Sequence, residues 1–239
     1  MPLVVQISDV HLRRTPADPT EPGSPDDGLR LTVAAVDAAL AGRPADLVLV
    51  TGDIADDGSI EACARTLTAL APLGAPVVAT PGNHDDPAAV ARVFGEVPSV
   101  DVGAWRVQLV DSVIAGEVSG AIDVGEVVAR LGAAGGRPTV LALHHPLVTL
   151  STHPMFQLDG AGEMVAGLVA RPSVRAVVSG HLHEAFEVHL GGVAHLGAPS
   201  TWYALRHEAE TFRVVDGPTG ARLIDLRDDG TLTWHLVPR

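Results

Sequence analysis

Lysine is absent from this sequence of 239 residues, and all 16 basic residues are arginine. Mechanisms that need a lysine amine are therefore excluded: Schiff bases, attachment of pyridoxal phosphate, and the phosphate-loop lysine of nucleoside triphosphatases. Only one cysteine is present, Cys63, so no disulfide can form within the chain. It lies in an alanine-rich helical pattern, which favours a small buried core residue over a reactive thiol.

Positive charge and long apolar runs are also scarce. The 29 acidic residues outnumber the 16 basic ones, which gives a net charge of −13. So acidic a chain lacks the positive surface that binds DNA phosphates, and we expect no nucleic-acid duplex as a partner. Apolar stretches such as 46–51 and 139–143 are far shorter than the roughly 18 residues that cross a bilayer. We therefore expect a cytoplasmic protein with no membrane partner.

The composition does support a folded core, since hydrophobic residues make up 46% of the chain and charged residues 19%. In the first half, short β-rich runs alternate with alanine-rich segments of helical period. The predicted strands are 3–8, 47–51 and 77–80, and the predicted helices are 29–41 and 59–70. This alternation is typical of βαβ units around a buried sheet and predicts an α/β protein.

The second half begins with two short strands after Val100 and then continues the alternation. Helices are predicted near 125–134 and 162–170, and strands at 139–143 and 174–179. Short β runs joined by glycine-containing turns follow, at 185–190, 193–196, 211–215, 221–225 and 231–236. We predict two packed sheets, the first mainly parallel and the second more antiparallel, with helices outside. Because no linker or repeat divides the chain, we predict a single domain over residues 1–239.

Five clusters of Asp, Asn and His occur, each where a predicted strand stops: 9–11, 52–56, 82–85, 144–146 and 180–183. Side chains at the carboxyl ends of strands in an α/β sheet face a common crevice. Carboxylate, imidazole and amide-oxygen donors suit Mn²⁺, Fe²⁺/Fe³⁺, Zn²⁺ or Co²⁺. The donors are too many for one ion, and sharing one carboxylate gives each of two ions about four protein ligands. They are Asp9, His11, Asp53, Asn83, His144, His181 and His183.

The charge of such a site indicates its substrate. Two divalent ions, two carboxylates and a hydroxide held between the metals leave about +1, which attracts an anion. A phosphate ester fits, because each ion can bind one non-bridging oxygen while the bridging hydroxide attacks phosphorus in line. His84 is poorly placed to reach the ion of its neighbour Asn83. We expect it to face the phosphoryl group instead and to donate either a proton to the leaving alkoxide or a hydrogen bond to the developing charge. Asp56 and Asp85 are candidates to orient a histidine, or simply to stabilise a turn or helix start.

The order D-x-H, G-D-x-x-D, G-N-H-D, H-H-P and G-H-x-H resembles that of the calcineurin-like metallophosphoesterase superfamily. It is most similar to the bacterial class III cyclic-nucleotide phosphodiesterases and glycerophosphodiesterases. The resemblance extends from Leu3 to about Tyr203. It implies a four-layer α/β/β/α sandwich of two mixed sheets flanked by helices, with a dinuclear metal site at its edge.

The resemblance also implies a role for each residue. Asp9, His11 and His183 correspond to ligands of the first ion, and Asn83, His144 and His181 to ligands of the second. Asp53 corresponds to the ligand that bridges both ions, and His84 to the catalytic histidine that binds no metal.

Three further residues are weaker candidates. His145 is a candidate to contact a ligand or the substrate, since the first histidine of such a pair is usually the metal ligand. Thr201 and Trp202 lie in a segment that contacts substrate in similar proteins, and a structural turn with a packed Trp is the equal alternative.

The leading hypothesis is a dinuclear-metal phosphodiesterase that acts on 3′,5′-cyclic nucleotides, as a monomer or dimer. A phosphomonoesterase or glycerophosphodiesterase is the first alternative, because the metal core is shared and the loops at Arg13–Gly28 and Pro146–Gly160 select the substrate. A noncatalytic protein-binding scaffold is the distant alternative. Such a protein is expected to have lost ligands, whereas all seven donors are present.

Overall fold

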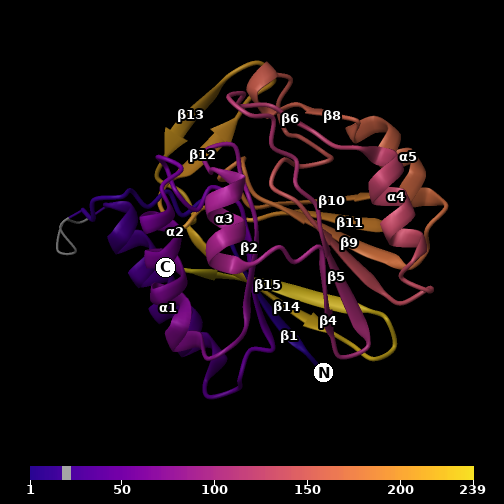
Figure 1. Cartoon of the computed structure of the whole chain (residues 1–239), viewed down its shortest axis with the longest axis horizontal. Coiled ribbons are helices and arrows are strands. Elements are labelled where there is room, and N and C mark those ends of the chain that lie inside the picture. Colours follow the sequence, from indigo (N-terminus) through magenta and orange to yellow (C-terminus); the bar gives the residue numbers. More distant parts are fainter. Residues whose placement is uncertain (18–22) are drawn as a thin grey trace.

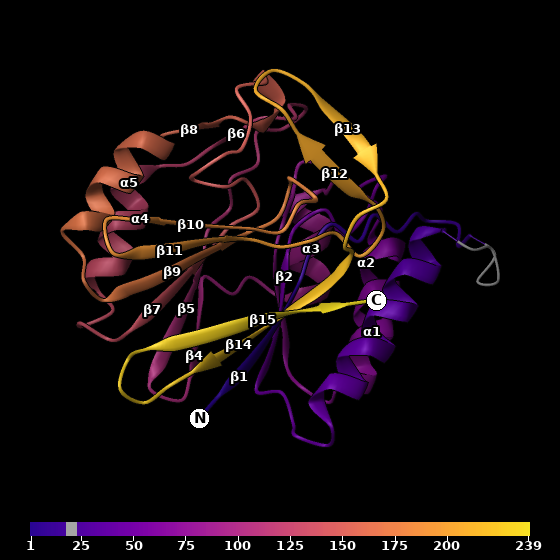
Figure 2. The same ribbon diagram turned by 180° about the vertical axis from the view of Figure 1, so that it is seen from behind.

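The computed structural model describes residues 1–17 and 23–239, so the predicted loop Arg13–Gly28 lies partly outside the described residues. Two large β-sheets pack face to face, and helices cover both outer faces (Figures 1 and 2). Both sheets mix parallel and antiparallel pairs. The predicted α/β class, with two mixed sheets flanked by helices, is confirmed.

The first sheet has five strands in the order β15-β14-β1-β2-β3. The strands are β1 (Leu3–Ile7), β2 (Leu47–Thr51), β3 (Val77–Thr80), β14 (Gly220–Leu226) and β15 (Leu232–Pro238). β1, β2 and β3 run parallel, whereas β14 and β15 form an antiparallel hairpin that pairs with β1. The register places Val4 opposite Leu47 on one side and opposite Ile224 on the other.

The second sheet has six strands in the order β10-β11-β9-β7-β5-β4. They are β4 (Ser99–Val102), β5 (Trp105–Leu109), β7 (Thr139–Ala142), β9 (Val174–Ser179), β10 (Phe186–Leu190) and β11 (Val193–Gly197). The central strands β5, β7, β9 and β11 run parallel, and only the outer strands β4 and β10 pair antiparallel.

The predicted difference between the sheets is wrong. Two of the four pairings in the first sheet are antiparallel, compared with two of the five in the second. The reason is long-range pairing: the C-terminal hairpin β14–β15 returns to the free edge of β1 instead of extending the second sheet.

The remaining described strands form two small sheets. β12 (Ala204–His207) and β13 (Phe212–Val215) form an antiparallel hairpin. β6 (Gly120–Ala121) pairs in parallel with β8 (Leu158–Asp159). The sequence pattern predicts β13 but not β12.

Five α-helices cover the sheets in the described residues. They are α1 (Pro25–Leu40), α2 (Ile60–Leu70), α3 (Pro87–Phe94), α4 (Val124–Gly132) and α5 (Ala161–Val169), with 3-10 turns η1 (Ala71–Leu73) and η2 (Pro154–Phe156). Helix starts follow local chemistry: the side chain of Ser24 accepts a hydrogen bond from Asp27 N before Pro25, and Asp86 accepts one from Ala88 N before α3.

Successive side chains of a strand point to opposite faces of the sheet. The apolar cores beneath the helices are therefore separate from the core between the two sheets. Val5 and Ile7 of β1 pack with α1, α2 and α3, whereas Val4 packs between the two sheets. In β7, Leu141 packs with α4 and α5, whereas Val140 packs between the sheets. The order of layers is therefore α/β/β/α, as the family resemblance implies.

Cys63 belongs to α2 and is fully buried in the core between the helices and the first sheet. Burial raises the pKa of its thiol to about 12, so the thiolate does not form near neutral pH. The prediction that Cys63 is a small buried core residue is confirmed.

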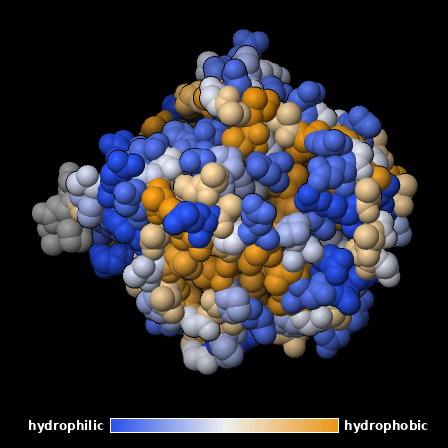
Figure 3. All heavy atoms as spheres, in the orientation of Figure 1, coloured by the Kyte–Doolittle hydropathy of each residue, from blue (hydrophilic) through white to orange (hydrophobic). Residues whose placement is uncertain are grey.

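On the face of the molecule shown in Figure 3, hydrophilic residues cover most of the rim and hydrophobic residues gather near the centre, beside α3. Across residues 1–17 and 23–239, no helix combines the length and the apolar character that a bilayer span requires.

Candidate metal centre

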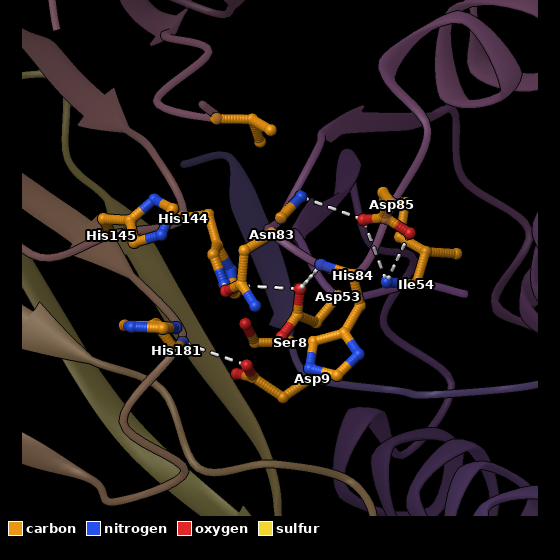
Figure 4. A network of polar contacts seen from close by, with 12 residues as sticks. Ser8, Asp9, Asp53, Ile54, Asn83, His84, Asp85, His144, His145 and His181 are labelled. Atoms are coloured by element: carbon orange, nitrogen blue, oxygen red, sulfur yellow. Dashed lines mark hydrogen bonds and ion pairs between the residues drawn. The ribbon is translucent and has the colours of Figure 1, made fainter. Parts of the chain in front are cut away.

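The five predicted clusters all follow parallel strands. The clusters after β1, β2 and β3 come from the first sheet, and those after β7 and β9 come from the second. Their side chains meet at one edge of the sandwich, where Figure 4 shows Asp9, Asp53, Asn83, His144 and His181 around a common centre.

Buried hydrogen bonds connect the two sheets beneath this centre. Nε2 of Gln6 donates to Thr51 Oγ1 in the first sheet and to Ser179 O in the second, both at 3.1 Å. Gly180 N donates to His144 O at 3.0 Å, which joins the ends of β7 and β9. The ends of strands from both sheets are therefore held at fixed separations.

The first donor cluster consists of Asp9, His11, Asp53 and His183, all of them buried. The Nε2 atoms of His11 and His183 are 3.0 Å apart, and Nε2 of His183 is 3.4 Å from Oδ1 of Asp9. Nε2 of His11 is 3.6 Å from Oδ2 of Asp53. These are the residues that the family resemblance assigns to the first ion and to the bridge.

The second donor cluster consists of Asp53, Asn83, His144 and His181. Nε2 of His144 is 3.1 Å from Oδ1 of Asn83 and 3.4 Å from Oδ1 of Asp53. The ring centroids of His144 and His181 are 5.0 Å apart. The structure therefore brings together all seven predicted donors.

Asp53 belongs to both clusters. Its Oδ2 faces His11, and its Oδ1 faces His144 and accepts a hydrogen bond of 3.0 Å from His84 N (Figure 4). Burial acts to raise the pKa of Asp53, but His144 and His11 outweigh burial and hold that pKa well below its ordinary value. An ionised carboxylate with one oxygen toward each cluster has the geometry expected of a bridging ligand.

Each of the four clustered histidine rings is oriented by an oxygen acceptor at one of its nitrogens. The acceptors are Asp56 Oδ1 for His11 (3.2 Å), Thr51 O for His144 (2.9 Å), Tyr203 O for His183 (3.2 Å) and Met155 O for His181 (2.9 Å). These bonds use Nδ1 in three rings and Nε2 in His181. The other nitrogen of each ring is left for a metal, as in most metal-binding histidines.

The clusters fit divalent cations because buried acceptor atoms and a negative field converge on them. Burial acts to lower the pKa of His11, but the nearby carboxylates of Asp56 and Asp53 outweigh burial and raise it. The field that favours a proton between the Nε2 atoms of His11 and His183, which lie 3.0 Å apart, also favours a metal ion there. Oδ2 of Asp9 is buried and has no hydrogen-bond partner in the described part of the chain. A metal ion among these atoms would satisfy the oxygen and bind the two Nε2 atoms.

The electrostatic field at the second cluster also favours positive charge. Burial acts to lower the pKa of His144, but the carboxylate of Asp53 outweighs burial and raises that pKa to about 9. Burial lowers the pKa of His183 to about 4 and holds the pKa of His181 well below its ordinary value. His181 and His183 are therefore neutral near pH 7, the form in which imidazole binds a metal.

The backbone at the centre is strained. Of the six non-glycine residues with positive φ in residues 1–17 and 23–239, five are predicted metal ligands. They are Asp9 (53°), His11 (54°), Asp53 (50°), His181 (69°) and His183 (46°). Such conformations cost about 1–3 kcal/mol each and persist where surrounding structure imposes them. The fold therefore gives up stability to aim these side chains inward.

Asp56 connects His11, His84 and Arg13. Its Oδ1 is 3.2 Å from Nδ1 of His11 and 3.4 Å from Nδ1 of His84, and Arg13 Nε donates to its Oδ2 at 2.8 Å. The hydrogen bond to His11 outweighs partial burial and, together with Arg13, lowers the pKa of Asp56 to about 2. Of the two candidates to orient a histidine, Asp56 makes the contact.

Asp85 has a different role from the two that its sequence position indicates. It is buried and accepts hydrogen bonds from the backbone nitrogens of Ile54, Ala55 and Gly82, at 2.7–3.1 Å (Figure 4). In the described residues no histidine ring is bonded to it, and Asp86 is the residue that caps α3. Asp85 therefore fastens the loop after β3 to the loop after β2.

His145 is fully buried, and both of its ring nitrogens are already paired. Nδ1 lies 2.8 Å from Ser112 Oγ, and Nε2 lies 3.0 Å from Val118 O. Burial and the neighbouring His144 lower the pKa of His145 to about 3, so the ring stays neutral. His145 lies near His144 and His181 in a group that could hold a metal ion, but its ring nitrogens anchor the 112–118 segment, and His144 is the one whose Nε2 faces Asp53.

Thr201 and Trp202 differ in their access to the centre. Thr201 is fully buried, does not line the cavity described below, and its backbone nitrogen donates to Ser8 O at 3.3 Å. Trp202 lines that cavity, with its ring centroid 5.9 Å from that of His11, and its Nε1 donates to Gly23 O at 2.8 Å.

Sequence reasoning missed the supporting roles of Ser200, Tyr203 and Met155. Ser200 Oγ donates to Asp9 O at 2.7 Å, and the carbonyls of Tyr203 and Met155 orient His183 and His181. Carbonyl groups occur in every residue, so residue type carries no signal for two of these roles. The hydroxyl of Ser200 after the G-H-x-H block is the one signal that the sequence offers.

A cavity of about 570 Å³ opens in front of both clusters. Its polar side is made by predicted ligands of both clusters together with Asp56 and His84. The side chain of His84 is 41% exposed. Its other side is apolar and is made by the residues Val118, Met155, Phe156, Trp202, Tyr203, Leu205, Phe212 and Val214. A small anion with an apolar portion therefore matches the shape of this site.

The model of the calcineurin-like phosphoesterase family matches residues 2–185 of the chain. The chain belongs to the calcineurin-like phosphoesterase family. It is similar to a 3′,5′-cyclic-nucleotide phosphodiesterase of Nostoc sp., with 30% identity over 98% of this chain and 91% of the relative. It is also similar to the 3′,5′-cyclic adenosine monophosphate phosphodiesterase CpdA of Pseudomonas aeruginosa, with 31% identity over 96% of this chain and 87% of the relative.

Solved structures share the fold of this calcineurin-like phosphoesterase. A dimetal phosphatase from Danio rerio superposes with a TM-score of 0.69 at 14% identity and covers 95% of this chain and 93% of its own. A purple acid phosphatase from yellow lupin seeds superposes with a TM-score of 0.60 at 15% identity and covers 99% of this chain and 51% of its own. Family and donor clusters together make the chain a metal-dependent phosphoric ester hydrolase.

We predict that Gly180→Ala removes metal binding. A Cβ at this position would lie 2.7 Å from Asp9 Oδ2 and 2.8 Å from Thr51 O, and would also collide with Ser8 Oγ. The clash displaces Asp9 from the first cluster. Mn²⁺ at a hundredfold excess over its Kd is expected to raise the Tm of the wild type by roughly 5–10 °C and to leave the Tm of the variant unchanged.

Gly162→Ala in α5 is the matched control, because a Cβ there meets nothing within 4 Å. It should show the full rise in Tm with Mn²⁺. A full rise in Gly180→Ala would contradict the packing of Asp9 described above.

Proposed function

We propose that this chain is a phosphodiesterase that hydrolyses 3′,5′-cyclic nucleotides with two divalent metal ions. The observation that carries the proposal is the position of Asp53, whose two carboxylate oxygens face the two donor clusters beneath one cavity. The substrate follows from relatives at 30–31% identity, which are named as cyclic-nucleotide phosphodiesterases and align over 96–98% of this chain.

We assign the metal ligands as the family resemblance implies. Asp9, His11 and His183 would hold one ion; Asn83, His144 and His181 would hold the other; Asp53 would bind both. The donor set favours Mn²⁺, Fe²⁺/Fe³⁺, Zn²⁺ or Co²⁺. When bound, the ions supply Lewis-acid activation of the attacking water and of the phosphoryl oxygens.

His84 is proposed as the general acid. Its Nδ1 lies 3.4 Å from Asp56 Oδ1, and its ring lines the cavity outside both clusters. The other ring nitrogen is left for the substrate. As water adds to phosphorus and one P–O ester bond breaks, His84 gives its proton to the departing ribose oxygen, and the product is a nucleoside monophosphate.

The surroundings favour a diester over a monoester dianion. A terminal dianion would call for a free cation near the site, and Arg13 and Arg14 are the candidates that the sequence offers. In the structure Arg13 Nε is bonded to Asp56 at 2.8 Å, and Arg14 Nε is 3.4 Å from Glu61. Both charges are thus already paired with carboxylates, which supports the singly charged diester.

A cytoplasmic location, a single domain over residues 1–239, and a monomeric or dimeric state stay predictions. The acidic net charge of −13 supports the further prediction that nucleic-acid duplexes are not substrates.

The proposed function is tested with Mn²⁺-loaded protein and a panel of cyclic nucleotides, nucleoside monophosphates and glycerophosphodiesters. We predict the highest kcat/KM for a cyclic nucleotide. Asp53→Asn should lower that value by more than about 100-fold, because residues that merely touch a metal ligand already cost 10–100-fold when changed.

Asp57→Asn, in the same loop, is the matched control. Within residues 1–17 and 23–239, Asp57 binds only the backbone nitrogens of Arg14 and Ser59 and the hydroxyl of Ser59. It should retain near wild-type activity. A panel in which monophosphates or glycerophosphodiesters are the best substrates would overturn the proposed substrate.

His84→Ala is predicted to keep both metals and to lower kcat for cyclic AMP by about 100-fold, the usual loss on removing a general acid. Hydrolysis of bis(p-nitrophenyl) phosphate should fall much less, because p-nitrophenolate leaves without a proton. The exposed His189 provides a control substitution to Ala on β10. Equal losses for both substrates would argue against proton donation by His84.

A further inference from the structure

Aromatic side chains are concentrated around the cavity. The chain contains four Phe, three Trp and one Tyr, only 3% of its residues. Half of these eight line this single cavity: Phe156, Trp202, Tyr203 and Phe212. A site that needed only to hold a phosphate would have no use for so much apolar surface.

The aromatic residues form two separate walls. Trp202 and Tyr203 lie against the first cluster, with the Tyr203 ring 4.4 Å from His183 and 4.8 Å from Trp202. Phe156 lies against the second cluster, 5.4 Å from the ring of His181, and Phe212 packs on Phe156 at 5.1 Å. The ring of Phe156 therefore connects His181, a predicted metal ligand, to Phe212.

The second wall ends on the β12–β13 hairpin, which extends beyond the two main sheets in Figures 1 and 2. Phe212 and Val214 alternate along β13 and therefore share one face of the hairpin, which lines the cavity. Phe212 is 38% exposed and Val214 is 68% exposed. Together with Val118, also at this cavity, they are three of the eight exposed large hydrophobic residues in the described ranges.

The first wall is less available to a ligand. Trp202 has its indole nitrogen bonded to Gly23 O at 2.8 Å, and its ring meets Tyr203 edge-on. By contrast, Phe212 and Val214 keep apolar surface that no described part of the chain covers. The uncovered apolar surface of the cavity thus lies on the hairpin side.

We infer that Phe212 and Val214, backed by Phe156, form the surface on which the base of the cyclic nucleotide packs. The inference rests on the proposed function and deepens it by assigning substrate selectivity to the hairpin. The donor clusters hold the phosphate of any ester, whereas an apolar wall adds binding free energy only for an ester that carries a flat base. The hairpin would therefore select nucleotides over glycerol esters.

The test uses paired ligands that share a phosphate and differ in the base. The Mn²⁺-loaded wild type and Phe212→Ala are compared for the KM of cyclic AMP and for inhibition of bis(p-nitrophenyl) phosphate hydrolysis by AMP and by ribose 5-phosphate. We expect Phe212→Ala to raise the KM of cyclic AMP and the Ki of AMP about tenfold, a typical loss for one stacked base. The Ki of ribose 5-phosphate and the kcat should stay within about twofold, since the contacts to phosphate are retained.

Arg213→Ala is the matched control, because Arg213 projects from the opposite face of the same strand and its side chain is 68% exposed. It should leave all four constants unchanged. Phe212→Tyr, which keeps the ring, should retain the low Ki of AMP, so a structural defect in Phe212→Ala would be recognised.

The inference is overturned if Phe212→Ala leaves the Ki of AMP unchanged, or if Trp202→Leu alone raises it. It is also overturned if AMP and ribose 5-phosphate weaken equally. Failure of the proposed function looks different: the wild type then does not hydrolyse cyclic AMP, while the two inhibitors still report whether the hairpin binds a base.

Discussion

The buried carboxylates and imidazoles at the edge of the two sheets set the demand that the rest of the fold meets. The Nε2 atoms of His11 and His183 lie 3.0 Å apart, and Nε2 of His144 lies within 3.4 Å of two oxygen atoms. Left-handed backbone at five of the predicted ligands adds strain to this crowding. Such a centre persists only if the surrounding fold is rigid, and its buried carboxylates require positive charge beside them, which protonated His144 provides in the metal-free protein.

The sandwich of two sheets supplies that rigidity. The predicted ligands come from both sheets. Some follow β1, β2 and β3 of the first sheet, and the others follow β7 and β9 of the second. Buried hydrogen bonds from Gln6 join the sheets, and Asp85 binds three backbone nitrogens to fix two ligand loops against each other. The geometry of this site thus depends on packing as much as on the predicted ligands themselves.

Much of this centre could be predicted from the sequence, because its residues lie in short blocks at strand ends. The strands 47–51, 77–80 and 174–179 have the bounds that their hydrophobic runs predict, and all seven donors converge. Features set by long-range pairing could not be predicted. The hairpin β14–β15 joins β1 over more than two hundred residues of sequence, and Phe212 reaches the cavity only because β12 and β13 fold over it. The partners of Asp85 are backbone nitrogens, which no residue type reveals.

Calorimetric titration of the metal-free protein with Mn²⁺ counts the ions held by the two donor clusters that share Asp53. We predict two ions per chain for the wild type and the loss of dinuclear binding when Asp53 is replaced by Ala. Binding of a single ion by the wild type, or two ions retained by Asp53→Ala, would contradict a dinuclear centre bridged by Asp53.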